Sequence, residues 1–151
     1  MFSGFDLPER GFESIEANKS SLSDGCSQLS VLDYLKKDSF LYVSLFPENV
    51  FCEGYAYDLI LFSDNVEYQV RVVPCDRAYV WKREAGEVIP YEDLSAKVMC
   101  TEEEMRFAFD LESLPDIDFF EVFVLDLERF NEGGDFEYLM DDGQFSEIDF
   151  G

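Results

Sequence analysis

Apolar and polar side chains alternate along several short runs of this chain, and this alternation most limits what the chain can fold into. In VEYQVRVV, apolar residues occupy every second position from Val66 to Val72, and the polar Glu67, Gln69 and Arg71 lie between them. Successive side chains of a β-strand point to opposite faces, so a period of two is typical of a strand. The run predicts a strand with one apolar face.

Six further runs predict strands, and they cover residues 39–46, 57–62, 78–82, 96–100, 105–111 and 119–127. The turn-like triplet 63–65 separates two of the runs, which indicates a hairpin. Residues 39–46 are apolar on both faces, as expected of a central strand. Short strands at regular intervals predict a mainly β fold, in which an antiparallel sheet forms a sandwich or a curved half-barrel.

One segment before these runs has a different pattern. Ser30 and Asp33 form a variant of the capping box, and leucines recur at positions 29, 32 and 35. Lys36 and Lys37 follow at the end where a helix dipole favours cations. The segment predicts one short N-terminal helix, and with it an α+β fold is an alternative to a mainly β fold.

The chain has 151 residues, which suits a single domain. Residues 1–24 mix Gly, Ser and Pro and are expected to form an irregular N-terminal arm. Residues 25–151 are expected to form one β-rich domain, which ends in an acidic and aromatic segment at 131–151. Trp81 is expected either in the core or as a surface anchor. The aromatic residues expected in the core are Phe107, Phe109, Phe119, Phe120 and Phe123.

The net charge of the chain is strongly negative. Asp and Glu number 34 against 11 Lys and Arg, so the formal charge is −23. Residues 101–151 carry 17 of the acids and only 2 of the bases. Binding to nucleic acid phosphates depends on Lys and Arg, and an anionic membrane repels a chain of this charge. Direct binding to either is therefore not expected.

The segment from residue 131 onward has seven acids and no base. Its aromatics can fold back on the sheet, or they can enter pockets of a partner while the acids meet basic residues. The candidate partner-binding residues are Glu132, Asp135, Glu137, Tyr138, Asp141, Asp142, Phe145, Glu147 and Asp149. These residues predict a non-catalytic protein that engages a basic protein surface. In the sharpest form of this hypothesis, its acids imitate phosphates and inhibit a nucleic-acid-binding protein, as an anti-defence or immunity protein does.

Catalysis is not expected. The chain has no histidine, so Ser-His-Asp and Cys-His arrangements are impossible. It also lacks a nucleophile elbow and a Gly-rich phosphate loop. The acids of the C-terminal segment are of a kind that calcium binds, but Tyr138 and Met140 stand where an EF-hand requires oxygens. No catalytic residue, metal or cofactor is therefore predicted.

Two other functions fit the pattern. The order of a strand, a Trp-bearing strand, a further strand and an acidic turn, from Tyr68 to Gly143, resembles that of sugar-binding sandwich modules. The resemblance implies a carbohydrate-binding or cell-surface β-sandwich. The charge also suits an acidic chaperone or adaptor for a basic client.

The four cysteines, Cys26, Cys52, Cys75 and Cys100, lie far apart and include no CxxC pair. In a reducing cytosol such residues are usually small buried hydrophobes. No basic and apolar leader precedes the domain, so a cytoplasmic location is expected, in the host cell if a phage or virus encodes the chain. Two disulfides in an exported protein are the alternative.

Overall fold

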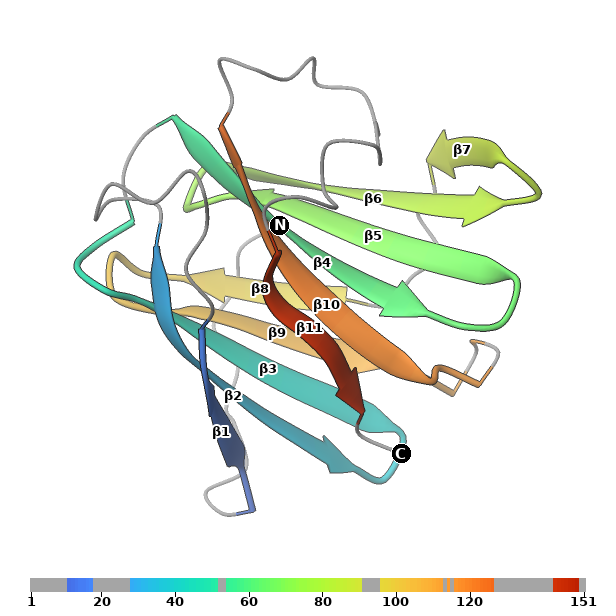
Figure 1. Cartoon of the computed structure of the whole chain (residues 1–151), viewed down its shortest axis with the longest axis horizontal. Coiled ribbons are helices and arrows are strands. Elements are labelled where there is room, and N and C mark those ends of the chain that lie inside the picture. Colours follow the sequence, from blue (N-terminus) through green and yellow to red (C-terminus); the bar gives the residue numbers. More distant parts are fainter. Residues whose placement is uncertain are drawn as a thin grey trace.

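The computed structural model describes residues 11–17, 28–51, 54–90, 96–112, 114, 116–126 and 143–149. All the regular structure of these residues is β-strand, arranged in two antiparallel sheets (Figure 1). This agrees with the mainly β fold that the alternating runs predict. No helix occurs within the described ranges, and hence none that could span a membrane.

The first sheet has five strands in the order β1-β2-β3-β9-β8. Their bounds are Glu13–Glu16 for β1, Leu29–Lys37 for β2, Phe40–Pro47 for β3, Met105–Asp110 for β9 and Ala96–Cys100 for β8. β3 lies in the middle of the sheet, as its two apolar faces predict. β1 falls within residues 1–24, so this part of the expected irregular arm is a strand that pairs with β2.

The second sheet has six strands in the order β11-β10-β4-β5-β6-β7. Their bounds are Gly143–Asp149 for β11, Phe119–Asp126 for β10, Tyr55–Phe62 for β4, Val66–Val73 for β5, Arg77–Glu84 for β6 and Glu87–Pro90 for β7. β4 and β5 form the predicted hairpin around residues 63–65. The following hairpin, β6–β7, turns at Ala85 and Gly86, which both have positive φ angles, as the tightest hairpin loops require.

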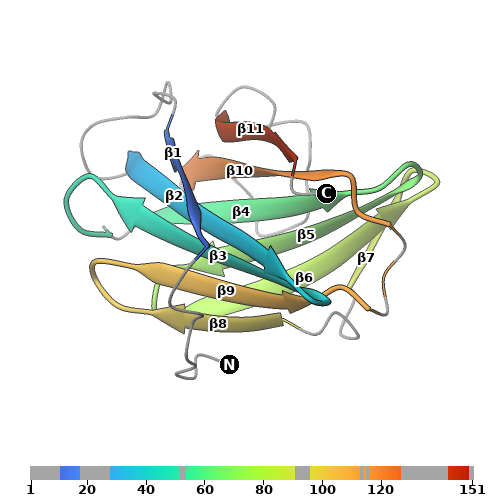
Figure 2. The same ribbon diagram turned by 90° about the horizontal axis from the view of Figure 1, so that it is seen from below.

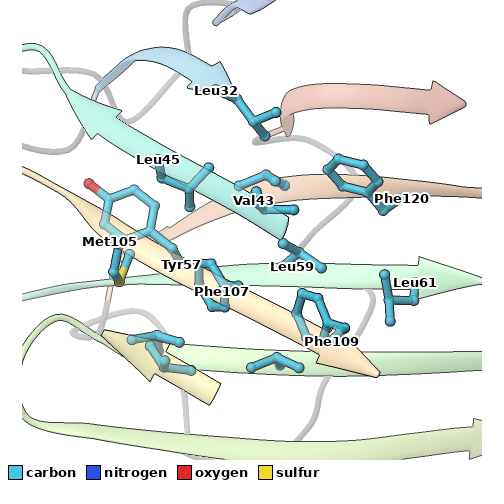
Figure 3. Packing of buried hydrophobic residues seen from close by; sticks show 14 of the residues in the cluster. Leu32, Val43, Leu45, Tyr57, Leu59, Leu61, Met105, Phe107, Phe109 and Phe120 are labelled. Carbon is cyan, nitrogen blue, oxygen red and sulfur yellow. The ribbon is translucent and has the colours of Figure 1, made fainter. Parts of the chain in front are cut away.

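The two sheets stack face to face in a β-sandwich-like arrangement (Figure 2). One core cluster contains side chains from both sheets, and Figure 3 shows several of them between the two layers. Val43 and Phe107 come from the five-stranded sheet, and Leu59 and Phe120 come from the six-stranded sheet. Each sheet therefore buries its apolar face against the other.

The predicted helix at residues 30–37 is wrong, because these residues belong to strand β2. A bulge between Leu29 and Val31 shifts the pairing of β2 with β3 by one residue. Leu29 and Leu32 are therefore both fully buried in the core, although they are three positions apart. Leu35 points to the opposite face and is half-buried. A bulged strand thus imitates the spacing of a helix.

The aromatic residues predicted to form the core do so, with one exception. Phe107, Phe109 and Phe120 are fully buried in the shared core. Phe123 is buried in a second, smaller cluster with Ala56 and Ile60, on the face of the six-stranded sheet turned away from the other sheet. Phe119 is only half-buried and lies on this same outer face, stacked on Phe62.

Cys75 and Cys100 form a disulfide across the two sheets, with their Cα atoms 5.2 Å apart. Cys75 lies in the turn between β5 and β6, and Cys100 is the last residue of β8. These two cysteines are therefore not the reduced buried residues expected from the sequence. The disulfide ties one end of the sandwich together.

Candidate functional site

The predicted partner-binding residues lie at one edge of the six-stranded sheet or outside the described residues. Phe145, Glu147 and Asp149 are on β11, which forms the edge of that sheet and pairs with β10. Asp149 is exposed, and its backbone carbonyl oxygen lies 3.5 Å from the hydroxyl of Tyr34 on β2. Glu132, Asp135, Glu137, Tyr138, Asp141 and Asp142 lie outside the described residues.

A second group of acids meets at the end of the sandwich that carries the disulfide. Glu48, Asp76, Glu102 and Glu103 come from three different turns, and all four are exposed. Val50 lies in the same loop as Glu48 and is 43% exposed, which is high for a large apolar residue. We call Glu48, Val50, Asp76, Glu102 and Glu103 the acidic end.

Backbone contacts hold the three turns of the acidic end together. The amide of Phe51 donates a hydrogen bond of 3.1 Å to the carbonyl of Glu102, which joins the β3–β4 loop to the β8–β9 turn. The Cys75–Cys100 disulfide joins the β5–β6 turn, and with it Asp76, to the same β8–β9 turn. Residues far apart in the sequence are thereby brought to one surface.

Thr101 shapes the turn that carries two of these acids, Glu102 and Glu103. Its amide donates to the carbonyl of Glu104 at 2.8 Å, and its hydroxyl accepts hydrogen bonds from the amides of Glu103 at 3.3 Å and Glu104 at 3.1 Å. This is the local hydrogen bonding by which Thr stabilises a tight turn. Glu102 and Glu103 are left exposed at the tip of the turn.

The acidic end brings four carboxylates to one end of the sandwich. Arg106 is close, but its Nε lies 2.6 Å from a carboxylate oxygen of Glu104, outside this group. Glu48, Glu102 and Glu103 form no ion pair in the part of the chain that the structure describes. An exposed apolar residue among carboxylates suits contact with a cationic surface.

This group of residues is not recognisable from the sequence alone. The sequence shows three consecutive acids, Glu102, Glu103 and Glu104. Their position near Glu48 and Asp76, however, depends on strand order and on the disulfide. Within the described ranges, no three acids or cysteines lie close enough to hold a metal ion. The chemistry of the group is therefore that of charge and hydrogen-bond acceptance.

Further exposed acids lie at the opposite end of the sandwich. Asp38, Asp64 and Glu112 occupy the turns after β2, β4 and β9, and Asp116 and Asp118 precede β10. Lys36 and Lys37 lie beside Asp38 and offset part of this charge. The described carboxylates thus occur at both ends of the sandwich.

The outer face of the six-stranded sheet forms the other polar arrangement. Asp58 and Arg71 are buried there as an ion pair, and Gln69 donates a hydrogen bond from its amide nitrogen to Asp58. Arg71 also lies over the ring of Trp81, with 5.1 Å between its guanidinium carbon and the ring centroid. Trp81 is half-buried and stacks on Tyr79. It is therefore neither a core residue nor a fully exposed anchor.

Comparisons with known proteins add no family to this description. No protein-family model, no curated protein and no solved structure matches the chain. The class that the fold defines is a mainly β protein with two antiparallel sheets.

Proposed function

We propose that this protein is a non-catalytic acidic binding protein that engages a basic surface of another protein. The observation that carries the proposal is the acidic end, where Glu48, Asp76, Glu102 and Glu103 from three linked turns lie at the same end of the sandwich as the exposed Val50. A rigid group of carboxylates attracts a cationic partner at long range, and the apolar residue supplies contact once the partner has docked. The C-terminal residues from Glu132 to Asp149 stay a sequence-based prediction of a second contact region.

The partner in this proposal is a cationic protein, and a nucleic-acid-binding enzyme is the sharpest candidate because its natural ligand is also a polyanion. Inhibition would then follow from occupation of the phosphate-binding surface. Fast association favours such an inhibitor, since opposite charges raise association rates to about 10⁸–10⁹ M⁻¹s⁻¹ at low salt. The proposed binding needs no cofactor and no metal.

The experiment has two stages. The partner is first isolated from a lysate of the native host at low salt, with a nuclease-treated lysate as control for bridging nucleic acid. Association and dissociation rates are then measured for the wild type and for the triple variant Glu48→Gln, Glu102→Gln, Glu103→Gln. The matched control is the triple variant Asp38→Asn, Asp64→Asn, Glu112→Gln, which removes the same number of negative charges from the opposite end.

We expect the first triple variant to slow association strongly and the control to change it little. Affinity of the wild type should also fall steeply between about 50 and 200 mM salt, as it does when many charged contacts are made. Equal effects of the two triple variants would mean that net charge alone acts, and the acidic end would then not be the site. Binding that is insensitive to salt would contradict charge-led recognition altogether.

A further inference from the structure

Two pairs of stacked aromatic rings lie on the outer face of the six-stranded sheet, with polar residues between them. Phe62 and Phe119 stack with their ring centroids 4.7 Å apart, and Tyr79 and Trp81 stack at 5.5 Å. All four rings are half-buried. β5 lies between the two pairs and contributes Glu67 and Gln69 to the same face. We call Phe62, Phe119, Glu67, Gln69, Tyr79 and Trp81 the aromatic face.

Gln69 lies in the middle of this face, and its side-chain oxygen has no hydrogen-bond donor among the described residues. The amide nitrogen of Gln69 donates to Asp58, which sets the orientation of the side-chain amide. The other amide atom, Oε1, is buried and has no hydrogen-bond partner in the part of the chain that the structure describes. Buried acceptors are nearly always paired, because an unpaired one is costly. Gln69 is fully buried, so a ligand donor would reach this acceptor only after the side chains around it rearrange.

The ion pair beneath Trp81 fixes the position of its ring. Arg71 is bound by two contacts to the buried Asp58, at 2.9 and 3.1 Å, and its guanidinium lies over the Trp81 ring. Tyr79 supports Trp81 from the neighbouring position of the same face. Arg71 is thus a positioning residue, and the aromatic pair on β6 is held rigidly before any ligand arrives.

Polar groups at the rim of the face can bond hydroxyls as donors and as acceptors. Arg83 and Glu67 are 4.0 Å apart, and their side chains are 42% and 32% exposed. β4 and β6 are separated by one strand, so Phe62 and Trp81 are about 10 Å apart in the direction across the strands. Aromatic rings can pack on the C–H faces of sugars, and polar groups can bond their hydroxyls. Two aromatic pairs with polar groups between them therefore suit a chain of several sugars.

We propose that the aromatic face binds a neutral oligosaccharide. Two sugar rings would pack on the Phe62–Phe119 and Tyr79–Trp81 pairs, and hydroxyls of the ligand would bond Glu67 and Arg83 at the exposed rim. A neutral glycan fits better than an acidic one, because the chain carries a net charge of −23. The site is on a sheet face and the acidic end is on turns, so this inference is independent of the proposed function.

The single tryptophan of the chain provides a direct probe of this site. We would titrate the full-length protein with neutral hexasaccharides of β-1,4-linked glucose, xylose, mannose and N-acetylglucosamine and of α-1,4-linked glucose, and follow the emission of Trp81. A glycan array would be screened in parallel. We expect at least one neutral glycan to change the emission in a saturable way. No saturable change with the hexasaccharides, together with a blank array, would overturn the proposal.

Variants test whether the aromatic face is responsible. Trp81→Ala should weaken binding by about tenfold or more, measured by calorimetry, as for an aromatic residue at the centre of an interface. Glu67→Gln is a milder change at the exposed rim and should weaken binding without unfolding the protein. The matched control is Phe40→Ala, which removes one ring of the stacked Phe40–Tyr42 pair on the outer face of the five-stranded sheet. Unchanged binding in Trp81→Ala, or loss of binding in Phe40→Ala, would contradict the assignment.

Discussion

Arg71 holds Asp58 by two hydrogen bonds on the outer face of the six-stranded sheet. Nε of Arg71 lies 2.9 Å from one carboxylate oxygen, and a terminal nitrogen lies 3.1 Å from the other. Both side chains are buried, and they face each other across the β4–β5 pairing. Burial raises the pKa of Asp58, while the charge and hydrogen bonds of Arg71 and the hydrogen bond of Gln69 act to lower it.

Removal of one partner from this pair should destabilise the protein strongly. Arg71→Met leaves a buried carboxylate without its cation, and we expect the free energy of unfolding to fall by about 3–5 kcal/mol in urea titrations. The double variant Asp58→Asn, Arg71→Met should recover part of the loss, since it buries no unpaired charge. The control is Glu67→Gln at the more exposed pair with Arg83, where a loss of no more than about 1 kcal/mol is expected. Equal losses at the two pairs would contradict this account.

The Cys75–Cys100 disulfide should contribute measurably to stability. It closes a loop with a sequence separation of 25, which corresponds to about 3.5 kcal/mol of unfolding free energy in the chain-entropy model. We expect the double variant Cys75→Ser, Cys100→Ser to unfold at lower urea than the wild type. Intact-mass analysis after alkylation, without reductant, should show these two thiols protected in the native protein. Alkylation of both would mean that the disulfide is absent and would support the cytoplasmic location expected from the sequence.

Tyr34 should titrate at unusually high pH. Its hydroxyl donates a 2.6 Å hydrogen bond to Glu13, and this bond, burial and the charges of Glu13 and Asp149 raise its pKa to about 12. The fold favours the protonated phenol. Its contribution to the free energy of unfolding is therefore fully present below the ordinary pKa near 10.0 and is lost as pH rises toward about 12. Phenolate absorbance of wild type minus Tyr34→Phe should show this late titration. In the Glu13→Gln variant the pKa of Tyr34 should be lower. An unchanged pKa would exclude Glu13 as the main cause of the shift.

Truncation of Phe107 tests whether the two sheets share one core. Phe107 is fully buried, and in its cluster it meets residues of the six-stranded sheet (Figure 3). We expect Phe107→Ala to lower the free energy of unfolding by about 3–5 kcal/mol. Phe40 is 38% exposed on the opposite face of the same sheet, so Phe40→Ala should cost much less. Similar costs at both positions would show that Phe107 is not packed between the sheets.

The strands were the part of this fold that local sequence determined. Val66–Val73 alternates in the sequence and is a strand with the same bounds in the structure, because side chains on a strand point alternately to its two faces. The same pattern located most other strands, including the hairpin at residues 63–65. The acidity of the chain is likewise a property of the sequence alone.

Other features depend on contacts between distant residues, and alternation does not encode them. The leucines of β2 have the spacing of a helix because of the bulge after Leu29. This bulge arises from the pairing of β2 with β3. Four cysteines allow three pairings, so only the meeting of β8 with the β5–β6 turn selects Cys75 with Cys100. Gln69 and Arg71 were expected on a polar face, yet they are buried there with Asp58. The acidic end exists only because three turns converge, and their convergence is set by strand order.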